Sequence, residues 1–276
     1  MADRHGRPPA ATASARFDPS RFAAALHTRE LGRRLRAVER TGSTNDDAWA
    51  ALAGEGHGVA VVAAVQERGR GRGGHAWTQV AGCGLAMSVG LYTRTGVRPG
   101  GLLPLAAGLA AARAAQALGL REARLKWPND VLVRGRKLAG LLCESRFTSE
   151  GDAVVVGIGM NVAHGASDFP PALRERATSL ALAGVTTTIE QAAAAFLDEL
   201  EPLWERIGEG DAAPILTGWA GLCDDWGRAM RARAPGGDIE GVAVRLAPDG
   251  ALVLETPAGE QRIVAGDVEP IAGAGA

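Results

Sequence analysis

Residues 123–147 read ARLKWPNDVLVRGRKLAGLLCESRF, and this stretch decides how the larger part of the chain folds. Short strand-like runs flank a turn at residues 128–130, and a second turn at residues 134–136 sends the chain back along residues 138–143. Apolar runs joined by a short glycine-containing turn are typical of a β-hairpin. We therefore expect both lysines of the stretch and Asp130 to meet near one end of a sheet.

These two lysines are the only ones in the chain. The chain has 30 lysines and arginines in total, and all of them except Lys126 and Lys137 are arginine. Lysine is a compact charge with a tunable pKa, and arginine does not replace it where those properties matter. We interpret the pair as a means of neutralising a carboxylate and a phosphate that must approach each other. Taken alone, residues 127–130 are also compatible with a simple turn.

A second informative segment follows the strand expected at residues 59–65. Residues 66–77 read QERGRGRGGHAW. Glycines let a backbone approach a ligand closely, and arginines between them offer forked donors to phosphate or carboxylate groups. The segment predicts an anion-binding loop. It lacks the Gly-Lys-Ser/Thr ending of a nucleotide P-loop. The alternative is a flexible RNA-binding tract, but such tracts lack flanking core strands.

The third segment, residues 155–162, reads VVGIGMNV. Glycines inside a strand indicate that a ligand or another backbone approaches closely. Asn161 is then a candidate for hydrogen bonding to a base or ribose. Glycines placed for sheet packing, with a structural asparagine beside them, explain the pattern equally well.

Periodicity in the rest of the chain predicts a mixture of helices and strands, which makes the main domain α+β. Helices are expected at 21–38, from 43 to about 53, and at 101–118, 187–208 and 212–222, and further strands at 85–92 and 152–162. From 228 to 271 short β-like runs alternate with turns, including an Asp249-Gly250 hairpin signal. This end of the chain predicts a small β-barrel.

Composition argues against several classes of protein. The net charge is −1, so charge alone favours neither nucleic acid nor a membrane surface. We find no apolar window near the roughly 20 residues of a membrane span, and no signal peptide. The three cysteines, Cys83, Cys143 and Cys223, are far apart and fit neither a disulfide framework nor a metal site. A cytoplasmic protein is expected.

Five motifs occur in an order that closely resembles the biotin–protein ligase family. They are Ser43-Thr44-Asn45, the Gly-Arg-Gly-Arg run at 69–72, Lys-Trp-Pro-Asn-Asp at 126–130, Lys-Leu-Ala-Gly-Leu-Leu at 137–142 and Gly-Ile-Gly-Met-Asn-Val at 157–162. The resemblance is strong over residues 38–165 and looser from about 226. It implies a class II synthetase-like catalytic domain with a mixed sheet, followed by an SH3-like β-barrel. We expect a disordered tail at 1–20, the biotin- and ATP-binding domain at 21–224 and the β domain at 225–276.

The resemblance also implies roles for individual residues. Biotin would be held by Ser43, Thr44, Asn45, Gln66, Arg70, Arg72 and Lys137, and the nucleotide by Arg72, Trp77, Lys126, Asn129 and Asn161. Lys137 would bind the biotin carboxylate and the forming acyl phosphate, Asn161 would face the adenine, and Asp130 would orient the site. The catalytic set is Lys137, Lys126, Arg72 and Asp130. No metal ligand is assigned, and Glu144 is only a candidate.

The implied activity is an ATP-dependent transfer of biotin, through biotinyl-5′-AMP, to a lysine of a biotin carboxyl carrier domain. Biotin and ATP would be the substrates, with Mg²⁺ carried by the phosphates, and the enzyme would be a monomer or weak homodimer. Gly73 and His75 replace arginines common in the family, so a more mobile loop is expected. Only about 37 residues precede the first motif, too few for a DNA-binding domain and linker. Alternatives are a lipoate–protein ligase and a biotin-responsive binding or regulatory protein.

Overall fold

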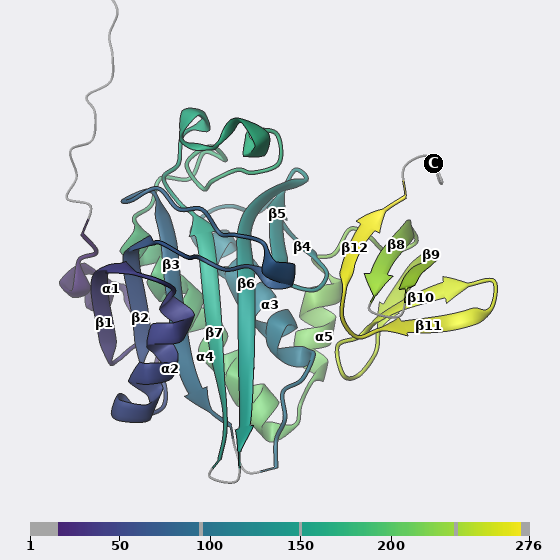
Figure 1. The fold of residues 1–276 in the computed structure, drawn as a ribbon, viewed down its shortest axis with the longest axis horizontal. Coiled ribbons are helices and arrows are strands. Elements are labelled where there is room, and N and C mark those ends of the chain that lie inside the picture. Colours follow the sequence, from purple (N-terminus) through teal and green to yellow (C-terminus); the bar gives the residue numbers. More distant parts are fainter. Residues whose placement is uncertain (1–15, 94–95, 149–150, 235–236, 272–276) are drawn as a thin grey trace, which may run out of the picture.

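The computed structural model describes residues 16–93, 96–148, 151–234 and 237–271. Within them, seven strands form one mixed sheet in the order β1-β2-β3-β7-β6-β5-β4 (Figure 1). The strands are β1 (Leu35–Thr41), β2 (Ala60–Gln66), β3 (Gly84–Tyr92), β4 (Ala123–Lys126), β5 (Asp130–Val133), β6 (Arg136–Thr148) and β7 (Gly151–Asn161). Among the seven described strands of this sheet, only β1 and β2 pair with each other in parallel. The predicted hairpin of β5 and β6 is confirmed.

Helices cover the two faces of this sheet unequally. The helices are α1 (Pro19–Ala25), α2 (Thr44–Glu55), α3 (Leu102–Ala117), α4 (Ile189–Glu209) and α5 (Ala213–Ala220). The helices α3 and α4 pack together across one face, whereas α2 covers only part of the other, over β2, β3 and β7 (Figure 1). The part of the sheet that α2 leaves uncovered is therefore free to carry a site.

The helix predicted at residues 21–38 is wrong over most of its length. The helix α1 ends at Ala25, and the chain becomes extended in β1 from Leu35. Gly32 between them has a φ of 75°, and an added Cβ would lie 2.4 Å from Leu197 Cδ1. Periodicity could not reveal this break, because β1 is recruited by its parallel pairing with β2 and Gly32 by its packing on α4.

The tail predicted at 1–20 is described only from residue 16, and residues 1–15 lie outside the described part. Within the described residues, α1 begins at Pro19, inside the predicted tail, with Asp18 as its N-cap. Asp18 also donates its backbone N–H to Glu190 at 3.0 Å, which ties the segment to the start of α4. No helix in the described ranges is long and apolar enough to cross a membrane.

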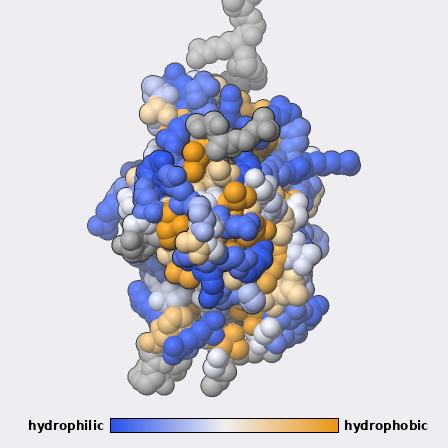
Figure 2. Space-filling view, turned by 90° about the vertical axis from the view of Figure 1, so that its right-hand side faces the viewer, coloured by the Kyte–Doolittle hydropathy of each residue, from blue (hydrophilic) through white to orange (hydrophobic). Residues whose placement is uncertain are grey.

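The C-terminal part is an antiparallel sheet in the order β11-β10-β9-β8-β12. Its strands are β8 (Ala229–Ala234), β9 (Gly237–Leu246), β10 (Leu252–Thr256), β11 (Gly259–Ile263) and β12 (Asp267–Pro270). The Asp249-Gly250 hairpin is confirmed, but no pairing joins β11 to β12 among the described residues, so the expected closed SH3-like barrel is not found. On the side of the molecule that carries the C-terminal sheet, the visible surface is mostly hydrophilic, and apolar residues form small interrupted patches (Figure 2).

This second sheet is docked on the main domain. Trp127 donates its indole N–H to the carbonyl of Gly250 at 3.1 Å. Gly250 has a φ of 87°, and an added Cβ there would meet Gly101 O at 2.7 Å. The β9–β10 turn therefore depends on glycine for both its conformation and its close approach. The contact places the edge strand β12 beside the uncovered part of the main sheet.

Candidate active site

A cavity of about 380 Å³ lies on the uncovered part of the main sheet. All seven residues of the predicted biotin set line it, namely Ser43, Thr44, Asn45, Gln66, Arg70, Arg72 and Lys137. It is also lined by Trp77, Lys126, Asn129 and Asp130. Segments that are far apart in the sequence therefore meet around one space. Asn161 alone of the predicted residues does not line it.

The floor of the cavity is built from glycines on β6 and β7. A Cβ added at Gly159 would lie 2.2 Å from Trp77 Cε2, and one at Gly140 would lie 3.5 Å from Trp77 Cζ3. A Cβ at Gly157 would lie 2.1 Å from Asn45 Oδ1. Of the two explanations left open for the glycines of residues 155–162, these contacts fit the packing of protein side chains on the sheet. Trp77 and Asn45 can lie on the sheet only because these positions carry no side chain.

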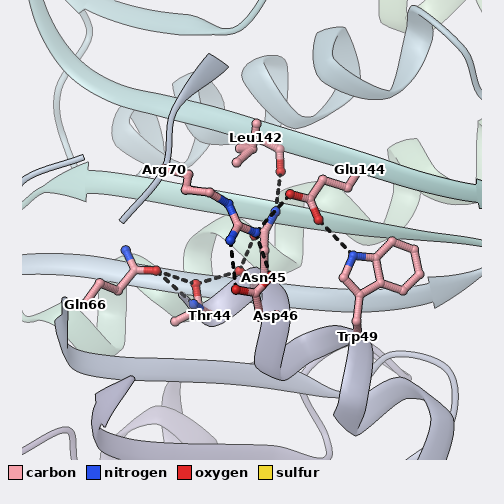
Figure 3. Close-up of polar contacts among 9 residues, drawn as sticks. Thr44, Asn45, Asp46, Trp49, Gln66, Arg70, Leu142 and Glu144 are labelled. Atoms are coloured by element: carbon pink, nitrogen blue, oxygen red, sulfur yellow. Dashed lines mark hydrogen bonds and ion pairs between the residues drawn. The ribbon is translucent and has the colours of Figure 1, made fainter. Parts of the chain in front are cut away.

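One end of the cavity holds a chain of neutral polar groups (Figure 3). Gln66 Oε1 accepts from the backbone N–H of Thr44 at 2.9 Å and lies 3.1 Å from Thr44 Oγ1. Thr44 Oγ1 is 2.7 Å from Ser88 Oγ, which donates to Asn45 Oδ1 at 2.7 Å. Asn45 Nδ2 donates to the carbonyl of Leu142 at 3.3 Å. All of these groups except Gln66 and Leu142 are buried.

The arginine loop is anchored through Arg70. Its guanidinium donates to both carboxylate oxygens of Asp46 at 2.8 Å and to Glu144 at 3.2 Å (Figure 3). The hydrogen bonds from Arg70 lower the pKa of Asp46 below its usual range. The other oxygen of Glu144 accepts from Trp49 Nε1 at 2.8 Å. The carboxylate considered as a metal candidate is thus already held by two donors.

Arg72 reaches in the opposite direction, toward the C-terminal sheet. Its Nη2 donates to the carbonyl of Gly266 at 3.3 Å, and its Nη1 is buried with no partner among the described residues. A buried donor without an acceptor is costly, about 1–3 kcal/mol. An acceptor brought by a ligand would satisfy this nitrogen.

Both lysines line the cavity beside the predicted hairpin. Lys137 Nζ lies 2.7 Å from Asp130 Oδ1, across the pair of strands β5 and β6. The turn between the strands places Arg134 at a φ of 50° and Gly135 at 75°. Lys126, the last residue of β4, is the register partner of Asp130 and makes no ion pair within the described residues. Two ammonium groups and one carboxylate therefore share this side of the cavity.

Asn161 is placed beneath the site. It is buried, and its Nδ2 donates to the carbonyls of Thr178 at 2.9 Å and Lys137 at 3.4 Å. The amide therefore ties the end of β7 to the segment that follows Lys137. These contacts are those of a structural asparagine, which is one of the two roles that the sequence left open for Asn161.

Sequence reasoning missed several lining residues, including Arg176, Arg233, Asp267 and Glu269. The carbonyl of Arg176 accepts from the backbone N–H of Lys137 at 2.8 Å, which brings a distant segment beside the lysine. Arg233 pairs with Glu269 at 3.2 Å at the rim formed by the C-terminal sheet. No motif marks these positions, and no local pattern could have indicated them.

The charges around the cavity favour an anionic ligand. Six cationic side chains line it, namely Arg70, Arg72, Lys126, Lys137, Arg176 and Arg233, against the carboxylates of Asp130, Asp267 and Glu269. The cavity thus has a cationic side and a neutral hydrogen-bonding end. Such an arrangement suits a ligand with a polar uncharged head and an acidic tail next to a phosphate.

Comparison with known proteins agrees with this chemistry. The sequence model of the Biotin/lipoate A/B protein ligase family matches residues 37–161, and that of the Biotin protein ligase C terminal domain matches residues 226–269. A biotin–[acetyl-CoA-carboxylase] ligase of Mycobacterium tuberculosis is 36% identical over 247 residues, covering 86% of this chain and 88% of that protein. The chain belongs to the biotin–protein ligase family.

Other members of the biotin–protein ligase family differ in length and share the fold. A bifunctional ligase/repressor of Bacillus spizizenii is 33% identical over 215 residues, and the match spans 77% of this chain but only 66% of that protein. The biotin protein ligase of Aquifex aeolicus, solved in complex with biotin and ATP, superposes with a TM-score of 0.73 at 25% identity, covering 87% of this chain and all of that one. The expected catalytic fold with its mixed sheet is confirmed.

Proposed function

We propose that this protein is an ATP-dependent biotin–protein ligase that forms biotinyl-5′-AMP and then transfers biotin to a lysine of a biotin carboxyl carrier domain of an acyl-CoA carboxylase. The observation that carries the proposal is the single cavity that joins a neutral hydrogen-bonding end to the only two lysines of the chain. The names of the relatives, and the biotin and ATP bound to the Aquifex protein, support it.

In the first step, a carboxylate oxygen of biotin attacks the α-phosphorus of ATP, a bond to that phosphorus forms, and pyrophosphate leaves. Two anions must approach, and fixed cations lower the cost of bringing them together. Lys137 is assigned to the biotin carboxylate, and Lys126 with Asn129 to the phosphates. Arg72, whose Nη1 is buried without a partner among the described residues, would gain an acceptor from the adenylate. Trp77 lies on the sheet floor, where it can pack against the nucleotide.

In the second step, the neutral amine of a carrier lysine attacks the acyl carbon of the adenylate. The new C–N bond forms as the bond between the acyl carbon and the phosphate oxygen breaks, and AMP leaves. The nitrogen then releases a proton, which we assign to Asp130 because its carboxylate lines the cavity and lies 2.7 Å from Lys137. The loop over the adenylate would also exclude water, which otherwise hydrolyses the anhydride.

The side chains of the described residues do not form a protein cage for Mg²⁺. No cluster of three metal-ligating side chains suited to an ion exists among the described residues. Asp130 and Glu269 are each paired with a cation, and Glu144 is held by Arg70 and Trp49. Mg²⁺ keeps most of its water and commonly binds through substrate phosphates. We therefore treat it as part of the MgATP substrate and derive no step from a protein-bound ion.

A lipoate–protein ligase is the alternative within the same fold, since the family matched at residues 37–161 includes both activities. The neutral end of the cavity favours biotin. The side-chain oxygen and nitrogen atoms at this end of the cavity can pair with the N–H and C=O groups of a ureido ring, whereas a dithiolane ring makes no such hydrogen bonds. The separate match to the biotin protein ligase C-terminal domain points the same way.

Transfer of labelled biotin tests the proposal. The protein is incubated with labelled biotin, MgATP and a carrier domain, and a carrier Lys→Ala variant serves as the acceptor control. Label should appear only on the unmodified carrier and should be lost with Lys137→Ala. Arg136→Ala is the matched control, because it removes the neighbouring cation, which lies outside the cavity and pairs with Glu175.

Three results would contradict parts of the proposal. Tight biotin binding without transfer would indicate a sensor or binding module. Transfer of labelled lipoate in preference to biotin would favour the alternative ligase. Full activity of Lys137→Ala would remove the role assigned to that lysine.

A further inference from the structure

The geometry points to Ser88 as a positioning residue that directs the hydroxyl hydrogen of Thr44 away from the cavity, so that Thr44 can only accept hydrogen bonds from a ligand. This inference rests on the proposed function, because it assigns the specificity of the biotin end of the same site. Ser88 lies on β3, is fully buried and is not among the residues that line the cavity. Its influence on a ligand must therefore pass through Thr44 and Asn45.

Two backbone groups determine how the side-chain amides are oriented. The N–H of Thr44 can only donate, so the atom 2.9 Å away on Gln66 must be the oxygen. The carbonyl of Leu142 can only accept, so the Asn45 atom 3.3 Å away must be the nitrogen. Asn45 therefore directs its oxygen toward Ser88. Neither orientation depends on how a hydroxyl is turned.

The direction of the hydroxyl chain follows from these assignments. Asn45 Oδ1 needs a donor, and Ser88 Oγ at 2.7 Å supplies it. Ser88 has then used its one hydrogen, so the 2.7 Å contact between Ser88 and Thr44 requires the hydrogen of Thr44. The reverse direction would leave Asn45 Oδ1 buried without a donor and facing another oxygen.

The competing contact is weaker. Thr44 Oγ1 lies 3.1 Å from Gln66 Oε1, which is longer than the 2.7 Å to Ser88. O–H···O bonds in proteins cluster near about 2.7–2.8 Å. Gln66 Oε1 also keeps the backbone N–H of Thr44 as a donor. Giving up the hydroxyl contact to Gln66 therefore leaves no group without a partner.

The consequence for a ligand is a fixed pattern of one acceptor beside one donor. Thr44 offers lone pairs, and Gln66 Nε2, on the far side of its amide from Thr44, has no partner among the described residues. The complement is a ligand edge with an N–H next to a C=O, as in a cyclic urea. An oxygen in place of that N–H would put lone pairs against lone pairs.

The test compares biotin with two cyclic-carbamate analogues, in each of which oxygen replaces one ureido N–H. Dissociation constants are measured by calorimetry for the unmodified protein and for Ser88→Ala. The unmodified protein should bind one of the two carbamates at least about 100-fold more weakly than biotin, because a site built to accept from an N–H rejects an analogue that lacks it. In Ser88→Ala the hydroxyl of Thr44 can turn and donate to the carbamate oxygen. The ratio of the carbamate dissociation constant to the biotin dissociation constant should therefore fall roughly tenfold.

Ser179→Ala is the matched control. Ser179 is another fully buried serine, donating to the carbonyl of His164 at 2.6 Å, and has no contact with Thr44. The Ser179→Ala variant should lose comparable stability, and its ratio of carbamate to biotin dissociation constants should be unchanged. If Ser88→Ala does not fold, Ser88→Cys keeps a weaker donor of similar size and should give an intermediate ratio.

The possible failures can be told apart. If the unmodified protein binds no biotin, the proposed function and this inference are both overturned. If it binds and transfers biotin but the serine variants weaken biotin and both carbamates equally, only the inference is overturned. Ser88 would then be a packing residue with no influence on ligand choice.

Discussion

Alanine at two glycines of β7 should impair the binding of two different substrates. An added Cβ lies 2.2 Å from Trp77 at Gly159 and 2.1 Å from Asn45 at Gly157, whereas ordinary contact begins at 3.4 Å. Each neighbour must therefore retreat by about 1 Å or more, and misplacement of that size can cost roughly 100-fold in catalysis. Gly159→Ala should raise KM for ATP, and Gly157→Ala should raise KM for biotin, each by about tenfold to 100-fold.

Pyrophosphate release with one substrate varied at a time measures both constants. Gly221→Ala is the control, because its nearest neighbour is Thr217 O at 3.5 Å and its backbone is helical. Overpacking also costs stability, about 1–3 kcal/mol, so melting curves must show that each variant is folded at the assay temperature. If both variants raise the same KM, or if neither KM changes, the assignment of Trp77 and Asn45 to separate substrates is wrong.

Three further outcomes follow from local physics. Gly54→Ala should raise the free energy of unfolding by about 0.5 kcal/mol in chemical denaturation, because Gly54 lies inside α2 and an added Cβ meets nothing within 4 Å. Lowering the pH from about 7 to about 5 should lower the melting temperature. Burial lowers the pKa of His57 and His164. The stability that these neutral histidines contribute is therefore complete above their ordinary pKa of 6.5 and is lost as the pH falls through the lowered pKa values. A melting temperature that does not change with pH would contradict this. Asp46→Ala should change the free energy of unfolding by less than about 1 kcal/mol, since its pair with Arg70 is half exposed, yet it should speed release of the adenylate in a filter-binding assay. An unchanged release rate would show that the pair does not hold the loop.

Several elements could be predicted from the sequence because their determinants are local. The strands at 59–65, 85–92 and 152–162 and the helices at 101–118 and 187–208 are confirmed within a few residues. Continuous apolar runs, the capping box of Thr188 and Gln191, and the terminal Gly210 at a φ of 74° mark these elements without reference to the rest of the chain. The β5–β6 hairpin is local in the same sense, so the meeting of Lys137 with Asp130 could be foreseen.

Other features needed the order of the strands in the sheet. The predicted helix at 21–38 failed because β1 owes its conformation to pairing with β2, which lies 25 residues further along. The closed barrel expected at the C-terminus depends on contact between β11 and β12, which no turn residue determines. Family motifs placed residues in the site but could not show that Arg70 pairs with Asp46 or that Asn161 lies beneath the cavity.

The fold family, many of the local elements and eleven of the residues that line the cavity could be predicted from the sequence, because short motifs record the backbone conformations and charges that a ligand requires. How those residues contact one another depends instead on tertiary packing. Ser88 lies 43 residues from Asn45 and 44 from Thr44, and their contact exists because β3 lies under the start of α2. A hydrogen bond forms only at particular distances and angles, and for residues so far apart the packing of helix on sheet sets both.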